Sequence, residues 1–164
     1  MLLCPFEMAD LYEVTTMKFL LPALIEGHRA DLRGFIERTP AGRLLGLVIL
    51  VFGDGVSAIE IPIRPELTFD GHAAQGGFVG TLAAYAAVST PTASMPEGWL
   101  SATTGYEVQN LGPAIGSKLV GVGRTIKNSK SSAVAAADIF AEQSGTWAHV
   151  ATCLATCRLF STSQ

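Results

Sequence analysis

Hydrophobic and polar residues alternate with two different periods along this chain. Between positions 19 and 36, apolar side chains recur every three or four residues, as on one face of a helix. The sequence Thr39-Pro40-Ala41-Gly42 stops this period, so we predict an N-terminal helix that ends there. Residues 1–18 have no clear period and are expected to form a loose arm. The apolar positions of the helix are Phe19, Leu20, Ala23, Leu24, Leu32, Phe35 and Ile36.

A continuous apolar run over residues 44–52 predicts a buried strand. Gly53-Asp54-Gly55 predicts a turn, and isoleucines alternate with other residues over positions 56–63. The two segments therefore predict a β-hairpin with one buried face.

Residues 76–89 are apolar on every side over the length of a helix. Such a helix must be enclosed by other parts of the protein. Pro91, Ser94 and Pro96 predict the loop that leaves it.

The remainder of the chain has the pattern of strands. Segments 100–108, 115–126, 133–141 and 147–160 are separated by turn signals. Alanine at every second position of the third segment suits close packing against a helix. This order of elements predicts an α+β class, with a curled antiparallel sheet around one long central helix. Since no repeat or linker divides residues 1–164, we predict a single domain.

Composition narrows the class of protein. Of 164 residues, 49% are hydrophobic and 15% are charged, which excludes disorder and suggests that a second copy covers apolar surface. The net charge of −3 argues against nucleic acid as a partner. The longest apolar run is far below the ~20 residues that cross a membrane, and no secretory signal is recognised. We expect a cytoplasmic homo-oligomer with no membrane partner.

The cysteines and two of the histidines are expected to be structural. Cys4, Cys153 and Cys157 form no Cys-x-x-Cys pair and are too few for a zinc site. On one strand, Cys153 and Cys157 would lie ~13 Å apart, beyond disulfide reach. We predict buried inert thiols and no metal site. His28 is expected on a solvated helix face with Arg29, and His149 within the sheet.

The candidate chemistry lies where the apolar helix begins, at Gln75, Gly76 and Gly77. The first N–H groups of a helix have no intrahelical acceptor and lie at the positive end of its dipole. Glycine lets a ligand approach them closely. The N–H groups of Gly76 and Gly77 therefore suit a thioester carbonyl that becomes an oxyanion. From their spacing alone, the two glycines equally suit a structural role in which they only permit close contact between the helix and the sheet.

Two side chains just before this helix are candidates to activate water. Asp70 and His72 are two residues apart, and histidine is a competent general base at neutral pH. The simpler roles are a helix-capping loop residue for His72 and a turn residue before Gly71 for Asp70.

Several of these features together resemble hotdog-fold acyl-CoA thioesterases of the phenylacetate-degradation, PaaI-like type. The resemblance covers about residues 33–160. It implies a hotdog fold, an acyl-CoA small-molecule substrate, and no cofactor besides the coenzyme A of that substrate. It also implies a homodimer or a dimer of dimers, a homotetramer, with the thioester between two subunits. The features are Leu44-Leu45-Gly46, the alternating hairpin, Ile63-Arg64-Pro65-Glu66-Leu67, Gln75-Gly76-Gly77 at a helix start, and the final meander.

The chain departs from the family's motif at two places. Eight residues after Gly76, where the family carries an Asp or Glu that attacks the thioester or activates water, this chain has Ala84. The family's Asn-x-x-Gly before the glycine pair is replaced by Phe69-Asp70-Gly71-His72. Thr81, one turn before Ala84, is expected to hold a water, and Tyr85 to pack in the core.

Three cations flank the predicted turn at Asn128-Ser129: Arg124, Lys127 and Lys130. The resemblance makes them candidates for the phosphates of coenzyme A, which need cations at the rim of a pocket. The simpler interpretation is that these charged side chains at a turn are only solvated.

The leading hypothesis is an acyl-CoA thioesterase in which Gly76 and Gly77 polarise the carbonyl, Gln75 orients it, and His72 or Asp70 activates water. The alternative is a non-catalytic protein that binds acyl-CoA or an aromatic ligand after losing the acid at Ala84. A hydratase on the same fold would need an Asp/His dyad on this loop, but no further hydratase pattern accompanies Asp70 and His72.

Overall fold

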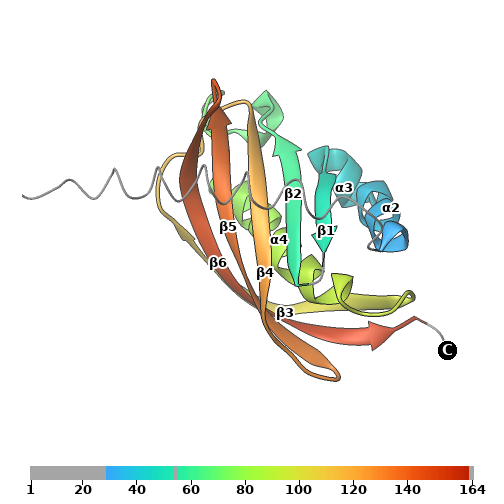
Figure 1. The fold of residues 1–164 in the computed structure, drawn as a ribbon. Coiled ribbons are helices and arrows are strands. Elements are labelled where there is room, and N and C mark those ends of the chain that lie inside the picture. Colours follow the sequence, from blue (N-terminus) through green and yellow to red (C-terminus); the bar gives the residue numbers. More distant parts are fainter. Residues whose placement is uncertain (1–28, 54, 163–164) are drawn as a thin grey trace, which may run out of the picture.

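The computed structural model describes residues 29–53 and 55–162. In this part of the chain, six antiparallel strands form one sheet in the order β1-β2-β4-β5-β6-β3. Figure 1 shows the strands bent around α4, which lies behind them. The predicted α+β hotdog fold is confirmed. The elements are α2 (Ala30–Arg38), α3 (Pro40–Leu45), β1 (Val48–Gly53), β2 (Val56–Pro62), the 3-10 turn η1 (Pro65–Leu67), α4 (Gly76–Ala93), β3 (Trp99–Asn110), β4 (Lys118–Asn128), β5 (Ser132–Gln143) and β6 (Thr146–Ser161).

Small residues bring α4 close to the sheet. Ala135 and Ala137 of β5 are almost completely buried, as the alternation predicts. A Cβ atom at Gly123 of β4 would lie 2.2 Å from the carbonyl oxygen of Ala86, so only glycine permits this approach. The hydroxyl of Ser57 donates to the same oxygen at 2.8 Å. The position of α4 is therefore fixed by direct contact with β2, β4 and β5.

The segment before β1 is helical further than predicted. Thr39 ends α2 and also begins α3, because its Oγ1 accepts a hydrogen bond from the N–H of Gly42 at 3.0 Å and Pro40 takes the first helical position. Gly46, with φ +68°, ends α3. The prediction of a strand from Leu44 is wrong at its start: Leu44 and Leu45 end a helix, and the strand begins at Val48.

Two other boundaries differ from the sequence analysis. Pro91 lies inside α4, which continues to Ala93, because a proline near a helix C-terminus removes only one backbone hydrogen bond of a buried segment. The strand predicted from Ile115 begins at Lys118, since Ile115 forms only an isolated bridge with Ala73. The remaining strands agree with the prediction to within about two residues, the usual uncertainty of such boundaries.

Arg29, a neighbour of His28 on the helix face that we expect to be solvated, does not itself face solvent. Its side chain is buried, and its guanidinium donates to the carbonyl oxygens of Thr92, Met95 and Trp99, each at 3.0 Å. It also pairs with Asp31 at 2.8 Å. These bonds tie the start of α2 to the end of α4 and the start of β3.

Cys153 and Cys157 are free and buried, as predicted. Burial, followed by the negative charge of Asp138, raises the pKa of the Cys153 thiol to about 11, and burial also raises the pKa of Cys157. Cys4, His28 and the apolar positions 19–25 lie outside the described residues. Over the described part of the chain, no helix is long and apolar enough to span a membrane.

Candidate functional site

A groove of about 340 Å³ lies between α2, α4 and β3. Ala84 lines it and is partly exposed, whereas its neighbour Ala83 is completely buried, so position 84 is not part of the core. Thr81 also lines the groove. Tyr85 packs against the core, as expected, and its partly buried side chain lines the groove as well. The groove lining is Leu32, Phe35, Ile36, Thr39, Thr81, Ala84, Tyr85, Val88, Ser89, Leu100, Ser101, Thr103 and Tyr106.

None of these described lining residues is an acid, a histidine or a cation. Such a volume with a mainly apolar wall is typical of a small-molecule site. The groove therefore suits a neutral apolar or aromatic group but holds no strong base of its own.

The start of α4 presents one free backbone donor. Gln75 is extended before the helix, and its Oε1 accepts from the N–H of Gly77 at 2.7 Å. Its carbonyl oxygen accepts from the N–H of Phe78 at 2.8 Å. The N–H of Gly76 has no partner among the described residues and is exposed. The expectation that both glycine N–H groups are available is therefore met only by Gly76 in this arrangement.

Asn110, at the end of β3, lies beside this helix start. A Cβ atom at Gly76 would have only Asn110 Nδ2 near it, at 3.5 Å. Sequence reasoning missed Asn110, because its position depends on the pairing of β3 with β6 and no local pattern indicates that pairing.

The loop before α4 uses Asp70 as a turn residue. Its Oδ1 accepts from the N–H groups of His72 and Ala73, each at 2.8 Å, and Gly71 has φ +86°. The hydrogen bond from Ala73, and next that from His72, lower the pKa of the Asp70 carboxyl. A carboxylate so held is a weaker base. The simpler role proposed for Asp70 from the sequence is the one observed.

His72 is exposed and lines a second cavity of about 420 Å³, here called the loop cavity. This cavity shares no lining residue with the groove, so His72 and Ala84 do not line a common cavity within one chain. Its lining is Ile63, Arg64, Pro65, Thr68, Gly71, His72, Ile115, Gly116, Ser117, Gln143 and Ser144.

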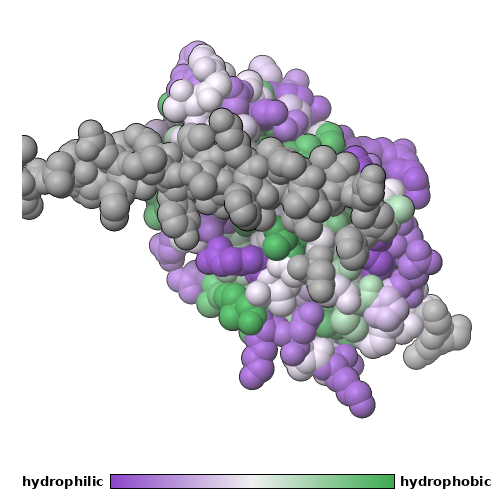
Figure 2. All heavy atoms as spheres, in the orientation of Figure 1, coloured by the Kyte–Doolittle hydropathy of each residue, from purple (hydrophilic) through white to green (hydrophobic). Residues whose placement is uncertain are grey.

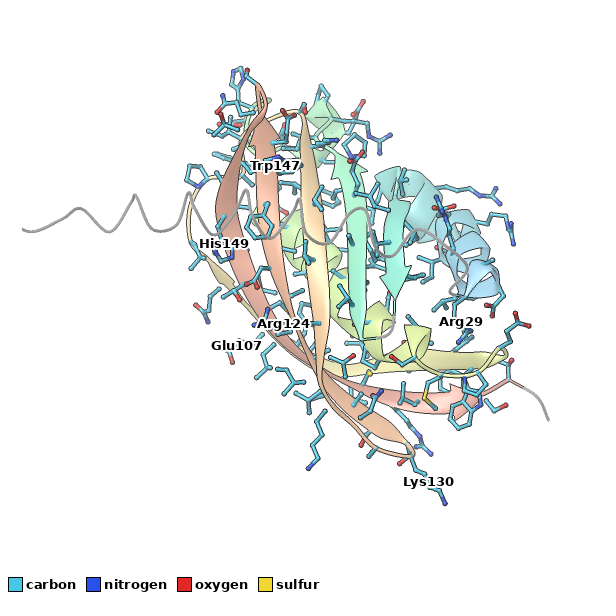
Figure 3. The ribbon with its side chains drawn as sticks, viewed as in Figure 1. Arg29, Glu107, Arg124, Lys130, Trp147 and His149 are labelled. Atoms are coloured by element: carbon cyan, nitrogen blue, oxygen red, sulfur yellow. The ribbon has the colours of Figure 1, made fainter. Side chains whose placement is uncertain are left out.

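The cations proposed for phosphate binding lie elsewhere. Arg124 donates to Asp138 at 2.7 Å. Lys127 and Lys130 are exposed near the turn that follows β4. The start of β4 lies beside the loop cavity, and this turn is about 30 Å away from it along the strand. Figure 3 labels Lys130 at the tip of this turn, and Figure 2 shows hydrophilic side chains projecting there. Within one chain, the fold does not bring these three residues to the groove.

His149 lies within the sheet, as expected, but the expectation that its ring nitrogens are satisfied is not met at Nε2. Its ring stacks on Phe140 at 5.0 Å between centroids, and its Nε2 lies 3.3 Å from Asp138 Oδ1 without the alignment of a hydrogen bond. Among the described residues, no three His, Cys, Asp or Glu side chains are grouped to hold a metal ion.

Several solved structures with a similar fold are described as thioesterases or thioesterase-superfamily proteins. A thioesterase family protein from Silicibacter pomeroyi is 25% identical, with a TM-score of 0.77, over 82% of this chain and 99% of its own. A thioesterase from Haemophilus influenzae is 15% identical, with a TM-score of 0.71, over 86% and 96%. The PaaI protein from the phenylacetic acid degradation operon of E. coli is 16% identical, with a TM-score of 0.67, over 78% and 89%.

No protein-family model and no curated protein sequence matches the chain. The resemblance to PaaI-like hotdog proteins is confirmed in the fold, and the similarity at 25% identity supports a thioesterase-type function.

Proposed function

Since the chain has the hotdog fold of thioesterase-superfamily proteins, we propose that it is an acyl-CoA thioesterase, which hydrolyses a thioester to a free acid and coenzyme A. The observation that carries this proposal is the unpartnered N–H of Gly76. The neutral groove begins five residues further along α4, at Thr81. A carbonyl oxygen at Gly76 would be polarised by that N–H and by the helix dipole, with the acyl group in the groove.

In the proposed reaction, water adds to the carbonyl carbon while the imidazole of His72 takes its proton. The oxyanion that forms is stabilised at the N–H of Gly76. As the carbonyl re-forms, the C–S bond breaks, and the imidazolium returns the proton to the leaving thiolate. Asp70 is proposed to hold the His72 loop rather than to act as the base, because its Oδ1 is already bound. Gln75 orients the helix start by holding the N–H of Gly77.

We propose that two copies pair along β3 and enclose the thioester between them. β3 is a 12-residue strand at the edge of the sheet, and much of it is exposed. Long open edges of this kind are prone to pair with another chain. Tyr106, which is 52% exposed on this strand, also lines the groove. Light scattering should give a mass of two or four copies at micromolar concentration, and a monomer would contradict the shared site.

Steady-state hydrolysis of aliphatic and aromatic acyl-CoAs, followed by thiol release, tests the proposed activity. We expect turnover, and His72→Ala should lower kcat by about 10²-fold while KM is nearly unchanged. His149→Gln, on the outer face of the sheet, is the matched control and should retain activity. Saturable binding without turnover would contradict the proposal and identify a non-catalytic acyl-CoA-binding protein. The cytoplasmic location and the dimer of dimers stay predictions.

A further inference from the structure

The loop cavity contains a cation without an acidic partner. Arg64 donates from Nη2 to the carbonyl oxygen of Leu44, which fixes its guanidinium. Among the described residues, its buried Nε and its Nη1 have no acceptor, and no carboxylate pairs with it. A guanidinium with unused donors beside a cavity is a binding group for an anion.

Among the described residues that line the loop cavity, none is an Asp or a Glu. His72 and Gln143 have side chains without a hydrogen-bond partner among the described residues. Two carboxylates contact the wall and are occupied. Asp70 accepts from two backbone N–H groups, and Glu142 accepts from the hydroxyl of Ser117 and from a backbone N–H at 2.6 Å. Arg64 is the one Lys or Arg among the described residues that lines either cavity.

Along the chain, Gly76 lies between His72 of the loop cavity and Thr81 of the groove. His72 precedes Gly76 by four residues, at most ~14 Å of extended chain. Thr81 follows it by five residues, ~7.5 Å of helix. The segment between is fixed, since the N–H of Ala74 bonds to Ala114 and that of Gln75 to Leu67, each at 2.9 Å. Along this segment, Thr81, Gly76 and Arg64 follow in the same order as the acyl group, the thioester carbonyl and the phosphate of a thioester on a phosphorylated nucleotide carrier.

We propose that the loop cavity binds a phosphate group through Arg64, and that this phosphate belongs to the nucleotide end of the carrier whose thioester lies at Gly76. The assignment of the carrier rests on the proposed function. It replaces the turn at Lys127 and Lys130 as the phosphate site.

Titration calorimetry with adenosine 3′,5′-bisphosphate and with inorganic phosphate tests the site without any turnover. Arg64→Gln should weaken nucleotide binding at least about tenfold, as expected for loss of a charge-assisted contact. Arg43→Gln, at an exposed arginine of α3, is the matched control and should bind as the wild type does. Gln143→Glu places a negative charge on the cavity wall at the exposed last residue of β5, and it should also weaken binding even if Arg64→Gln fails to fold.

Hydrolysis of an acyl-CoA and of the matching acyl-N-acetylcysteamine thioester tests the assignment to the carrier. Arg64→Gln should raise KM for the acyl-CoA at least about tenfold and leave the truncated thioester unaffected. Nucleotide binding unchanged in both variants would overturn the phosphate site. Equal affinity for inorganic phosphate and the bisphosphate would overturn its assignment to the carrier. Arg64-dependent nucleotide binding with no thioester turnover would instead refute only the proposed function.

Discussion

Gly76→Pro removes the proposed oxyanion donor with little effect on the fold. Gly76 is the first residue of α4, where proline is favoured because its missing N–H needs no intrahelical acceptor. Gln75 has φ −66° and ψ 133°, which is the conformation that a following proline requires. A Cβ atom at Gly76 would have only Asn110 Nδ2 near it, at an ordinary contact distance of 3.5 Å. We expect the free energy of unfolding to change by less than about 1 kcal/mol.

The same substitution should strongly reduce activity. Loss of one oxyanion donor costs about 10²- to 10³-fold in kcat. The N–H of Gly77 does not replace it, because Gln75 occupies that donor. The control is Gly76→Ala, which adds the same Cβ atom and keeps the N–H. Urea unfolding and acyl-CoA hydrolysis of both variants give the comparison. A stable proline variant that hydrolyses as fast as the alanine variant would refute the role of this N–H.

Three further outcomes follow from the structure. Ala84→Asp should fold, because position 84 faces the groove. Its kcat should not exceed that of the control Ala84→Asn, because His72 supplies the base. An increase in kcat of about tenfold or more would instead indicate that the chain has lost a catalytic acid at this position. Arg29→Met should lower the free energy of unfolding in urea by about 3 kcal/mol, since it removes a buried charge network, and a loss below about 1 kcal/mol would contradict this. At pH 8, Cys153 should be alkylated about 10²-fold more slowly in the native than in the unfolded protein, because its raised pKa leaves little thiolate, and Cys157 should also react more slowly when native; mass spectrometry after digestion measures this, and equal rates would count against buried thiols.

The elements that the sequence predicts best have a strong local period. Alternating alanines identified β5 and its face, and the unbroken apolar segment from Gly76 identified α4. The sequence failed where one signal has two meanings. Thr39-Pro40 both stops α2 and starts α3, and Pro91 is compatible with a helix end as well as with an exit loop.

The residues of the candidate site also differ in whether a local pattern predicts them. Gly76 and Ala84 are related by helical spacing, so their placement could be predicted from the chain alone. Asn110 and Tyr106 depend on β3 crossing to the far edge of the sheet, which no local pattern specifies. Arg64 offered one usable signal: it is the only Lys or Arg between Arg43 and Lys118, just before the glycine motif.

A crystal structure with a non-hydrolysable acyl-CoA analogue, in which a methylene group separates the sulfur from the carbonyl, tests the central claim most directly. The account predicts that the analogue's carbonyl oxygen lies about 2.7–3.1 Å from the N atom of Gly76, with the acyl group in the groove beside Ala84. An analogue bound with its carbonyl away from the start of α4, or with its acyl group outside this groove, would contradict the account.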